Sequence, residues 1–278
     1  MARRSNRVPE KKRQIVAIGG ASFRAEPENL AADRYILDLT RKKRPSICFV
    51  PTASAEPADS IATFYDAYTR LGAKPSVLRL FRRTPDLRTT LLSQDAIYVG
   101  GGNTKSMLAV WREWGLDAVL REAWRKGIVL AGVSAGAICW FTSGTTDSFG
   151  ADLRPFTGGL GLLEASYCPH YDSEPRRRPL YQSLIADRSL PPGIACDDGA
   201  AAHFVDDTLA GIVADASGPR GYSVSRSANG GAAEIELDTK VLIGRLPSSH
   251  VRSRLLSRPR FGVTSVDMPN MPNSRRFT

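Results

Sequence analysis

Short apolar runs alternate with helix-like segments over the first 140 residues, and this alternation is the feature that most constrains the fold. Such alternation is typical of a parallel sheet with helices on both faces. We therefore predict an α/β fold of three layers, with a mostly parallel central sheet flanked by helices. The predicted strands lie within 14–20, 46–54, 75–81, 95–104 and 128–133. The predicted helices are 59–73, 105–115, 116–127 and one that starts in "SAGAICWF".

The second half of the chain is less regular and predicts further strands around one helix. Further strands are expected in 159–163 and 194–214, a helix at 177–189, and late antiparallel edge strands at 221–227 and 232–237. After about residue 250 the periodicity is lost and Pro, Ser and Arg become frequent. The predicted organisation is a basic tail at 1–13, an α/β domain at 14–248 and a second basic tail at 249–278.

The positive charge of the chain is concentrated at its two ends. The net charge is +10, of which residues 1–14 carry +5 and residues 251–278 carry +5. The remaining body has 26 basic and 26 acidic residues, so we do not expect the core to bind nucleic acid. The tails have two interpretations, contact with nucleic acid or an acidic partner, and a solubilising end.

Several classes of protein are excluded by what the sequence lacks. No segment approaches the roughly 20 apolar residues that cross a bilayer, and the basic N-terminus has no apolar core of a secretory signal. The cysteines form no C-x-x-C pair, which favours buried thiols in a reducing cytoplasm over disulfides or zinc ligands. We therefore expect a cytoplasmic protein with no membrane partner. The cysteines are Cys48, Cys139, Cys168 and Cys196.

Ser134 follows the apolar run "GIVLAGV" in the pattern G-x-S-A-G. A nucleophile elbow places serine on a sharp turn from strand to helix, and small neighbours are needed because the turn is tight. The alternative is a tight turn at which Ser134 only caps the following helix. The local pattern thus indicates a nucleophile without excluding a structural serine.

A triple glycine ends another predicted strand, in "VGGGNT". Carboxyl ends of parallel strands meet at one edge of the sheet, so this loop is expected near Ser134. The amides of Gly102 and Ala135 would then form a two-donor oxyanion hole. The alternative is a phosphate-binding or simple turn, although the run lacks the Lys-Ser/Thr of a P-loop.

A serine nucleophile needs a base, and the chain has three histidines. His170 follows Pro169, which stiffens its loop, and is the preferred general base. His203 lies in an apolar strand-like stretch, and His250 lies at the start of the C-terminal tail. Two aspartates are candidates for orienting the imidazole, namely Asp198 before Gly199 and Asp147 in "GTTDSFG". Each of them also fits an ordinary turn.

Three consecutive arginines follow the histidine closely, in "EPRRRP". Arginine binds carboxylates through two parallel hydrogen bonds, so Arg176 or Arg177 is a candidate for binding an acidic substrate. The alternative is a solvated helix face.

The order "VGGGNT", "GVSAGA", "PHY" and an acid before glycine resembles the peptidase E (aspartyl dipeptidase) family of serine peptidases over about residues 14–240. The resemblance implies a fold similar to class I glutamine amidotransferases and an enzyme that needs no metal or other cofactor. It implies that Ser134 is the nucleophile, His170 the base and Asp198 the acid, with Asp147 as an alternative acid.

The resemblance also implies roles around these groups. Gly102 and Ala135 match the oxyanion donors, and Arg176 or Arg177 matches the arginine that holds an aspartyl carboxylate. Two departures stand out, because the histidine loop is shorter and richer in arginine and the acid is Asp instead of Glu. They weaken a strict preference for Asp-X dipeptides.

The expected function is therefore a serine peptidase that acts on short peptides, with Asp-X dipeptides among the candidates and a homo-oligomer as one possible state. A cyanophycinase-like isopeptide hydrolase is a second interpretation, but the arginines near the site count against a substrate with cationic side chains. A catalytically silent binding protein on the same scaffold is a third.

Overall fold

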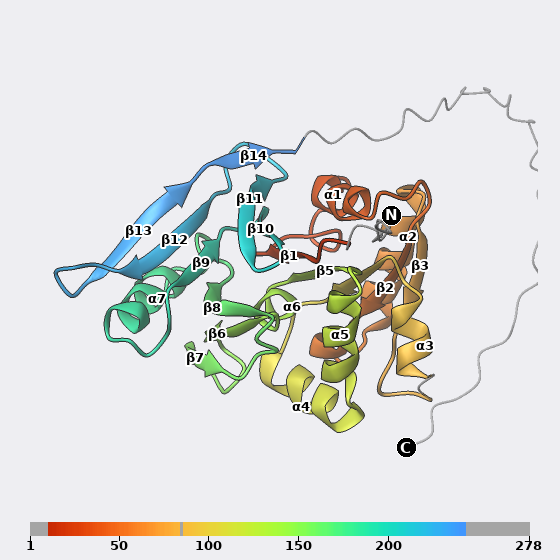
Figure 1. Cartoon of the computed structure of the whole chain (residues 1–278), viewed down its shortest axis with the longest axis horizontal. Helices are drawn as coiled ribbons and strands as arrows, with labels where there is room; N and C mark the ends of the chain where they lie inside the picture. Colours follow the sequence, from red (N-terminus) through yellow and green to blue (C-terminus); the bar gives the residue numbers. More distant parts are fainter. Residues whose placement is uncertain (1–10, 84–85, 243–278) are drawn as a thin grey trace, which may run out of the picture. The chain divides into compact units, whose positions relative to one another are not determined.

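An eight-stranded sheet organises the larger part of the protein, seen in a computed structural model that describes residues 11–83 and 86–242 (Figure 1). Its strand order is β14-β11-β10-β1-β5-β4-β2-β3. The strands from β1 to β3 in this order are parallel, whereas β10 pairs with β1 and β11 in antiparallel fashion. The strands are β1 (Gln14–Ile18), β2 (Ser46–Val50), β3 (Lys74–Val77), β4 (Ala96–Val99), β5 (Val129–Val133), β10 (Ala200–Val205), β11 (Thr208–Ala214) and β14 (Thr239–Val241).

Helices cover both faces of this sheet. Successive side chains of a strand point to opposite faces, so each buried strand packs against helices on both sides. On β1, Val16 and Ile18 pack in the cluster that contains Phe64 of α2, whereas Ile15 packs in the cluster that contains Leu120 of α5. The predicted three-layer α/β fold is confirmed. One face carries α1 (Ala31–Leu39) and α2 (Ala58–Arg70). The other carries α3 (Leu87–Leu92), α4 (Thr104–Trp114), α5 (Leu116–Arg125) and the short α6 (Ala135–Ile138).

A second sheet has six strands in the order β13-β12-β9-β8-β6-β7. Its strands begin after β5 in the chain, and β10 and β11 of the larger sheet lie between its β9 and β12. Helix α7 (Arg177–Ala186) packs on the second sheet through Tyr181, Leu184 and Ile185. The predicted late strands are β12 and β13, which pair in antiparallel fashion and form a hairpin that extends away from the large sheet (Figure 1). The strands are β6 (Phe141–Thr146), β7 (Arg154–Thr157), β8 (Leu163–Cys168), β9 (Gly193–Cys196), β12 (Gly221–Arg226) and β13 (Ala232–Leu237).

The sequence did not predict this second sheet, and the stretch after Ser134 shows why. The helix expected from "SAGAICWF" ends at Ile138, and Phe141 already begins β6. A side chain at Gly144 of β6 would place its Cβ 2.3 Å from the Tyr167 carbonyl oxygen of β8. Gly144 therefore allows β6 to pair closely with β8. Its partner, Tyr167, lies more than twenty residues away in the chain, so no local pattern indicates this pairing.

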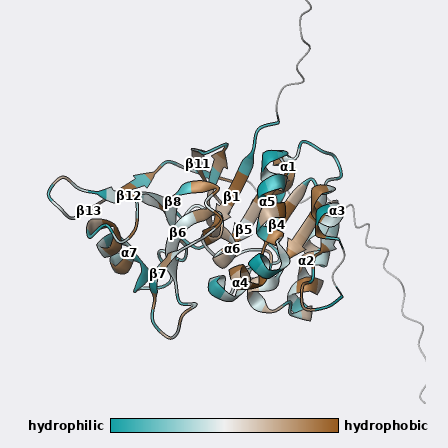
Figure 2. Cartoon of the chain, turned by 60° about the horizontal axis from the view of Figure 1, so that its bottom comes forward, coloured by the Kyte–Doolittle hydropathy of each residue, from teal (hydrophilic) through white to brown (hydrophobic). Residues whose placement is uncertain are grey.

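Aromatic packing and one hydrogen bond join the two sheets. The Phe141 ring stacks on Tyr167 and meets Phe204 of β10 edge to face. The buried Tyr167 hydroxyl donates to the Ala17 carbonyl of β1 at 2.9 Å. Figure 2 shows hydrophobic residues in the strands and hydrophilic residues in many of the connecting loops. Residues of both sheets therefore pack in one hydrophobic cluster. This packing fixes the loops at the ends of the two sheets relative to each other.

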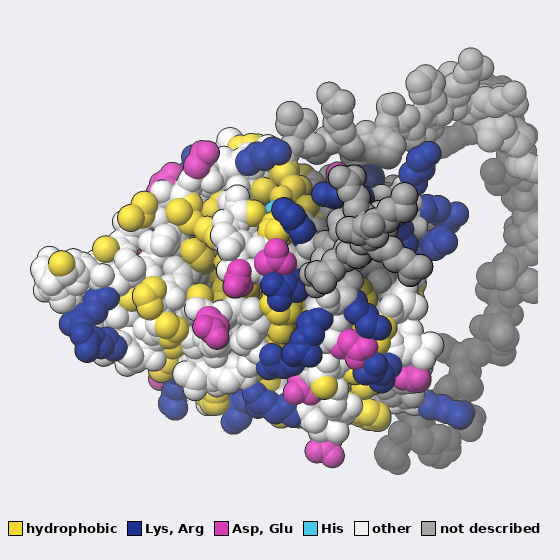
Figure 3. Space-filling view, viewed as in Figure 1, with side chains coloured by type: hydrophobic (Ala, Val, Ile, Leu, Met, Phe, Trp, Pro, Cys, Tyr) yellow, Lys and Arg dark blue, Asp and Glu magenta, His cyan; other side chains and the backbone are white. Residues whose placement is uncertain are grey.

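The surface of the described body mixes both signs of charge. Figure 3 shows Lys and Arg side chains interspersed with Asp and Glu on one face, in line with the balanced charge between the tails. The predicted tails lie outside the described residues, apart from Lys11, Lys12 and Arg13. None of the helices described is long and apolar enough to span a membrane.

Candidate active site

Ser134 lies on a strained turn between β5 and α6. Its backbone has φ 55° and ψ −114°, a region that non-glycine residues rarely adopt and that marks functional sites when the surroundings enforce it. The Ser134 amide donates to the Ile18 carbonyl at 3.1 Å, and its carbonyl accepts from the amides of Ala137 and Ile138. The turn therefore has the conformation of a nucleophile elbow.

The two glycines of the G-x-S-A-G pattern are required by close backbone approach. A Cβ at Gly132 would lie 2.1 Å from the Gly136 carbonyl oxygen, and a Cβ at Gly136 would lie 2.2 Å from the Val99 carbonyl oxygen. A side chain at Gly136 would force the turn away from the end of β4, and one at Gly132 would push β5 away from the start of α6. The glycines thus hold Ser134 at the carboxyl edge of the sheet.

His170 lies in the loop after β8 and bridges Ser134 and Asp198. Its Nε2 is 2.9 Å from Ser134 Oγ, and its Nδ1 is 2.7 Å from Asp198 Oδ1. A carboxylate only accepts hydrogen bonds, so the neutral imidazole carries its proton on Nδ1. Its Nε2 then accepts a hydrogen bond from the Ser134 hydroxyl. Like Ser134, His170 has a positive φ, of 52°.

The surroundings favour the charged form of Asp198. Burial opposes ionisation, but the hydrogen bond from His170, with the Ser173 side chain and the Arg177 charge, lowers the pKa of Asp198 below its usual value. The Asp198 amide donates to Asp172 Oδ1 at 2.9 Å, which holds the loop. Asp198 therefore lies beside Nδ1 as a carboxylate.

Asp147, the alternative acid, lies in the same pocket at a different place. The pocket is lined by Gly102, Asn103, Ser134, Asp147, Ser148, His170, Glu174 and Arg177. Asp147 is exposed, and the bond from Nδ1 of His170 goes to Asp198. The structure thus brings both aspartates to the pocket but pairs His170 with Asp198.

Gly20, to which the sequence pattern assigned no functional role, lies against the His170–Asp198 pair. A Cβ at Gly20 would be 1.8 Å from Asp198 Oδ1 and 2.5 Å from His170 Nδ1. The Gly20 carbonyl also accepts from the Gly199 amide at 2.9 Å. The double glycine after β1 was the signal, but its partners lie 150 residues or more away in the chain.

The predicted oxyanion donors flank the serine. Gly102 has φ 135°, and a Cβ there would lie 2.3 Å from the Ala53 carbonyl oxygen. Within the part of the chain that the structure describes, the Gly102 amide donates to no protein acceptor. Ala135 is the first residue of α6, where backbone amides have no acceptor within the helix. Both amides are therefore available to a bound oxyanion.

The three consecutive arginines have three different environments. Arg176 is exposed and pairs with Asp152 at 3.0 Å, whereas Arg177 is buried and lines the pocket. Arg178 pairs with Glu234 and lies over the rings of Tyr171 and Tyr222. Each guanidinium thus has a carboxylate from the chain itself, so the cluster no longer argues against a cationic substrate.

The remaining predicted groups lie elsewhere. His203 of β10 is buried, bonds the Tyr35 hydroxyl at 2.8 Å, and has its pKa lowered by burial. His250 lies outside the described residues. The four cysteines are buried free thiols, as predicted, and burial raises the pKa of Cys168 to about 12. Residues 11–83 and 86–242 contain no cluster of three or more His, Cys, Asp or Glu placed to hold a metal ion.

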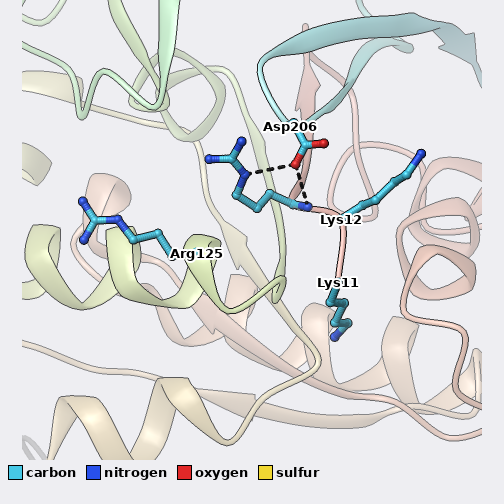
Figure 4. A pocket seen from close by; sticks show the side chains of 5 residues that line it. Lys11, Lys12, Arg125 and Asp206 are labelled. Atoms are coloured by element: carbon cyan, nitrogen blue, oxygen red, sulfur yellow. Dashed lines mark hydrogen bonds and ion pairs between the residues drawn. The ribbon is translucent and has the colours of Figure 1, made fainter. Parts of the chain in front are cut away.

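A second, basic pocket near the N-terminus is lined by Lys11, Lys12, Arg13, Arg125 and Asp206. Arg13 pairs with Asp206 at 3.0 Å. Figure 4 shows that Lys11, Lys12 and Arg125 point in different directions. These three cationic side chains do not converge on one point, so they do not form a single binding point for an anion.

Comparison with known proteins agrees with this geometry. Residues 15–212 match the profile of peptidase family S51. The chain belongs to peptidase family S51. As a member of this family it is a serine-type peptidase, and the predicted likeness to peptidase E is confirmed.

Two relatives show how similar known peptidases are to this chain. The uncharacterized peptidase YgaJ of Bacillus subtilis is 49% identical over 233 residues, which cover 83% of this chain and 99% of that protein. Peptidase E of Shewanella amazonensis is 29% identical over 189 residues, which cover 63% of this chain and 77% of that protein.

Two solved structures show the same fold. A peptidase from an acI-B1 actinobacterium superposes with a TM-score of 0.57 at 18% identity, covering 81% of this chain and 95% of that chain. A Listeria monocytogenes protein assigned to peptidase E superposes with a TM-score of 0.53 at 20% identity, covering 71% and 96%.

Proposed function

We propose that this S51 peptidase hydrolyses short peptides through a Ser134-His170-Asp198 triad and an acyl-enzyme. The observation that carries the proposal is the continuous pair of hydrogen bonds from Ser134 Oγ through the imidazole to the Asp198 carboxylate. In a triad the base accepts the serine proton and the acid holds the imidazole tautomer.

The first half of the reaction forms the acyl-enzyme. Ser134 Oγ attacks the scissile carbonyl while its proton passes to His170 Nε2. The Asp198 carboxylate stabilises the imidazolium that forms, and the amides of Gly102 and Ala135 donate to the oxyanion. His170 then gives its proton to the leaving amine as the C–N bond breaks.

The second half releases the acyl group. Water enters the open pocket, loses a proton to His170 Nε2 and attacks the ester carbonyl. The tetrahedral intermediate collapses, the ester C–O bond breaks, and the proton returns to Ser134 Oγ. No step requires a metal ion, since the serine and the two amides supply the nucleophile and the charge stabilisation.

The test uses Ser134→Ala and a serine-reactive fluorophosphonate. The variant should lose peptide hydrolysis and labelling while its melting temperature stays near that of the wild type, because the elbow is held by backbone contacts. Ser106→Ala, on the exposed surface of α4, is the matched control and should still be labelled. Unchanged turnover in Ser134→Ala would remove Ser134 from the reaction, and a folded wild type that resists labelling would favour a silent binding protein.

A further inference from the structure

The pocket beside Ser134 contains three charged side chains besides the His170–Asp198 pair. They are Asp147, Glu174 and Arg177. Arg177 was one of two arginines, with Arg176, predicted as candidates for binding an acidic substrate, whereas Glu174 had no predicted role. The way in which these three charges are paired determines what the pocket offers to a substrate.

Arg177 is already occupied by acceptors from its own chain. Its side chain is 3% exposed, and its Nε and Nη2 donate to the two carboxylate oxygens of Glu174 at 2.7 and 3.3 Å. Its Nη1 donates to the Thr145 carbonyl at 3.1 Å. A bidentate pair of this kind uses the guanidinium geometry that a substrate carboxylate would need. An acidic substrate would therefore have to displace Glu174 and leave it unpaired.

The charge that remains open to the pocket is negative. The Glu174 side chain is 42% exposed although it is paired, and Asp147 is exposed. Asp147, Glu174 and Arg177 together carry a net charge of −1, in addition to the Asp198 carboxylate of the triad. Opposite charges attract and like charges repel in such a partly enclosed cleft. The pocket should thus attract a cation and repel a carboxylate.

We propose that Glu174 sets the substrate specificity of this peptidase, so that the pocket selects a positively charged nitrogen near the scissile carbonyl and rejects a carboxylate. This inference rests on the proposed triad. The nitrogen has two possible sources, the free α-amine of an N-terminal residue and the side chain of Lys or Arg. Both present the same ammonium-type or guanidinium-type charge to Glu174 and Asp147.

The experiment compares kcat/KM for the 4-nitroanilides of Lys, Ala and Asp, each with a free and with an acetylated amine. The wild type should favour Lys over Asp by about tenfold, a size between that of exposed and buried charge pairs. If the α-amine is the group that is bound, acetylation should lower kcat/KM for all three substrates. If the side chain is bound, acetylation should leave the preference for Lys intact.

Glu174→Gln is the decisive variant. It removes the carboxylate charge and releases Arg177, so hydrolysis of the Asp substrate should rise, hydrolysis of the cationic substrates should fall, and the preference should drop to within about twofold. Glu236→Gln is the matched control, because Glu236 forms an exposed ion pair with Arg220 on the β12–β13 hairpin. It should keep the wild-type preference, and melting temperatures should show that both variants fold.

The outcomes separate the specificity from the triad. If Ser134 is labelled but the wild type prefers Asp, or Glu174→Gln keeps the wild-type ratio, the inference is overturned and the triad stands. If the protein is labelled but hydrolyses none of the amides, lysinamide must slow labelling more than aspartic acid α-amide, and the reverse order overturns the inference. If Ser134 is not labelled and nothing is hydrolysed, the triad fails and the specificity fails with it.

Discussion

The two sheets hold their parts of the candidate site in different ways. The end of the eight-stranded sheet presents Ser134 and Gly102 through backbone packing that admits only glycine at key positions. The end of the six-stranded sheet presents His170 and Arg177 through side-chain hydrogen bonds to Asp198 and Glu174. Backbone packing fixes the position of Ser134, whereas side-chain pairing fixes the protonation of His170 and the charge around Arg177. Substitutions at the ends of the two sheets should therefore have different effects on kcat, KM and pH dependence.

The largest effect is expected where the two sheets meet, at Asp198. Asp198→Asn keeps the shape but allows the wrong imidazole tautomer, and the corresponding change in a serine protease triad lowers kcat by about 10⁴. We expect a loss of that order in kcat, measured by steady-state hydrolysis of a peptide amide. A loss below about tenfold, or an equal loss in Asp147→Asn, would move the orienting role away from Asp198.

The lowered pKa of Asp198 gives this variant a pH signature. A carboxylate with a lowered pKa in the folded state contributes stability above its unfolded pKa, and this contribution is lost as the pH falls through the folded pKa. The melting temperature of the wild type should therefore exceed that of Asp198→Asn at pH 7. The difference should shrink as the pH falls below about 4, near the ordinary pKa of aspartate.

A smaller effect is expected at Gly20, a positioning residue for the same pair. A methyl group there overlaps both Asp198 Oδ1 and His170 Nδ1, and a misplacement of about 1 Å can cost about 10² in rate. Gly20→Ala should therefore lower kcat by about that factor with little change in KM. Gly218→Ala is a steric control, since a Cβ at Gly218 meets no atom within 4 Å and the Gly218 backbone lies outside the left-handed region. Equal kinetics for Gly20→Ala and the wild type would show that the pair tolerates the displacement.

The smallest effect is expected at Arg176, which directly precedes α7. The comparison is with its neighbour Arg177, which is buried. The Arg176 guanidinium is exposed and paired with Asp152 outside the pocket, and exposed ion pairs contribute roughly 0–1 kcal/mol. Arg176→Ala should change kcat/KM by less than about twofold and barely shift the melting temperature. A clear loss for acidic substrates alone would return Arg176 to a role in binding.

The candidate site was predictable where its signal was local. Gly132 and Gly136 lie within four residues of each other and approach each other directly, so the turn around Ser134 is encoded in one short segment. Pro169 likewise marks the rigid loop that carries His170. The parallel strands were predictable for a similar reason, because each apolar run is bounded by turn residues in its own neighbourhood.

Other parts had no local signal. The pairing of β6 with β8, which builds the second sheet, depends on strands that the pattern after Ser134 did not reveal. The contact of Gly20 with His170 joins residues 150 positions apart, and the double glycine after β1 does not indicate which residues it approaches. The separate environments of Arg176 and Arg177 follow from the geometry of one loop and the start of α7.

The sequence alone determined the fold class and the tight turn at Ser134, because hydrophobic periodicity and close backbone packing act over a few residues. Only the tertiary structure decided which aspartate lies beside His170, which arginine enters the pocket, and that Glu174 occupies this arginine. These pairings depend on distances between loops from different sheets, and such distances are set by strand order and packing and by no single segment of the chain.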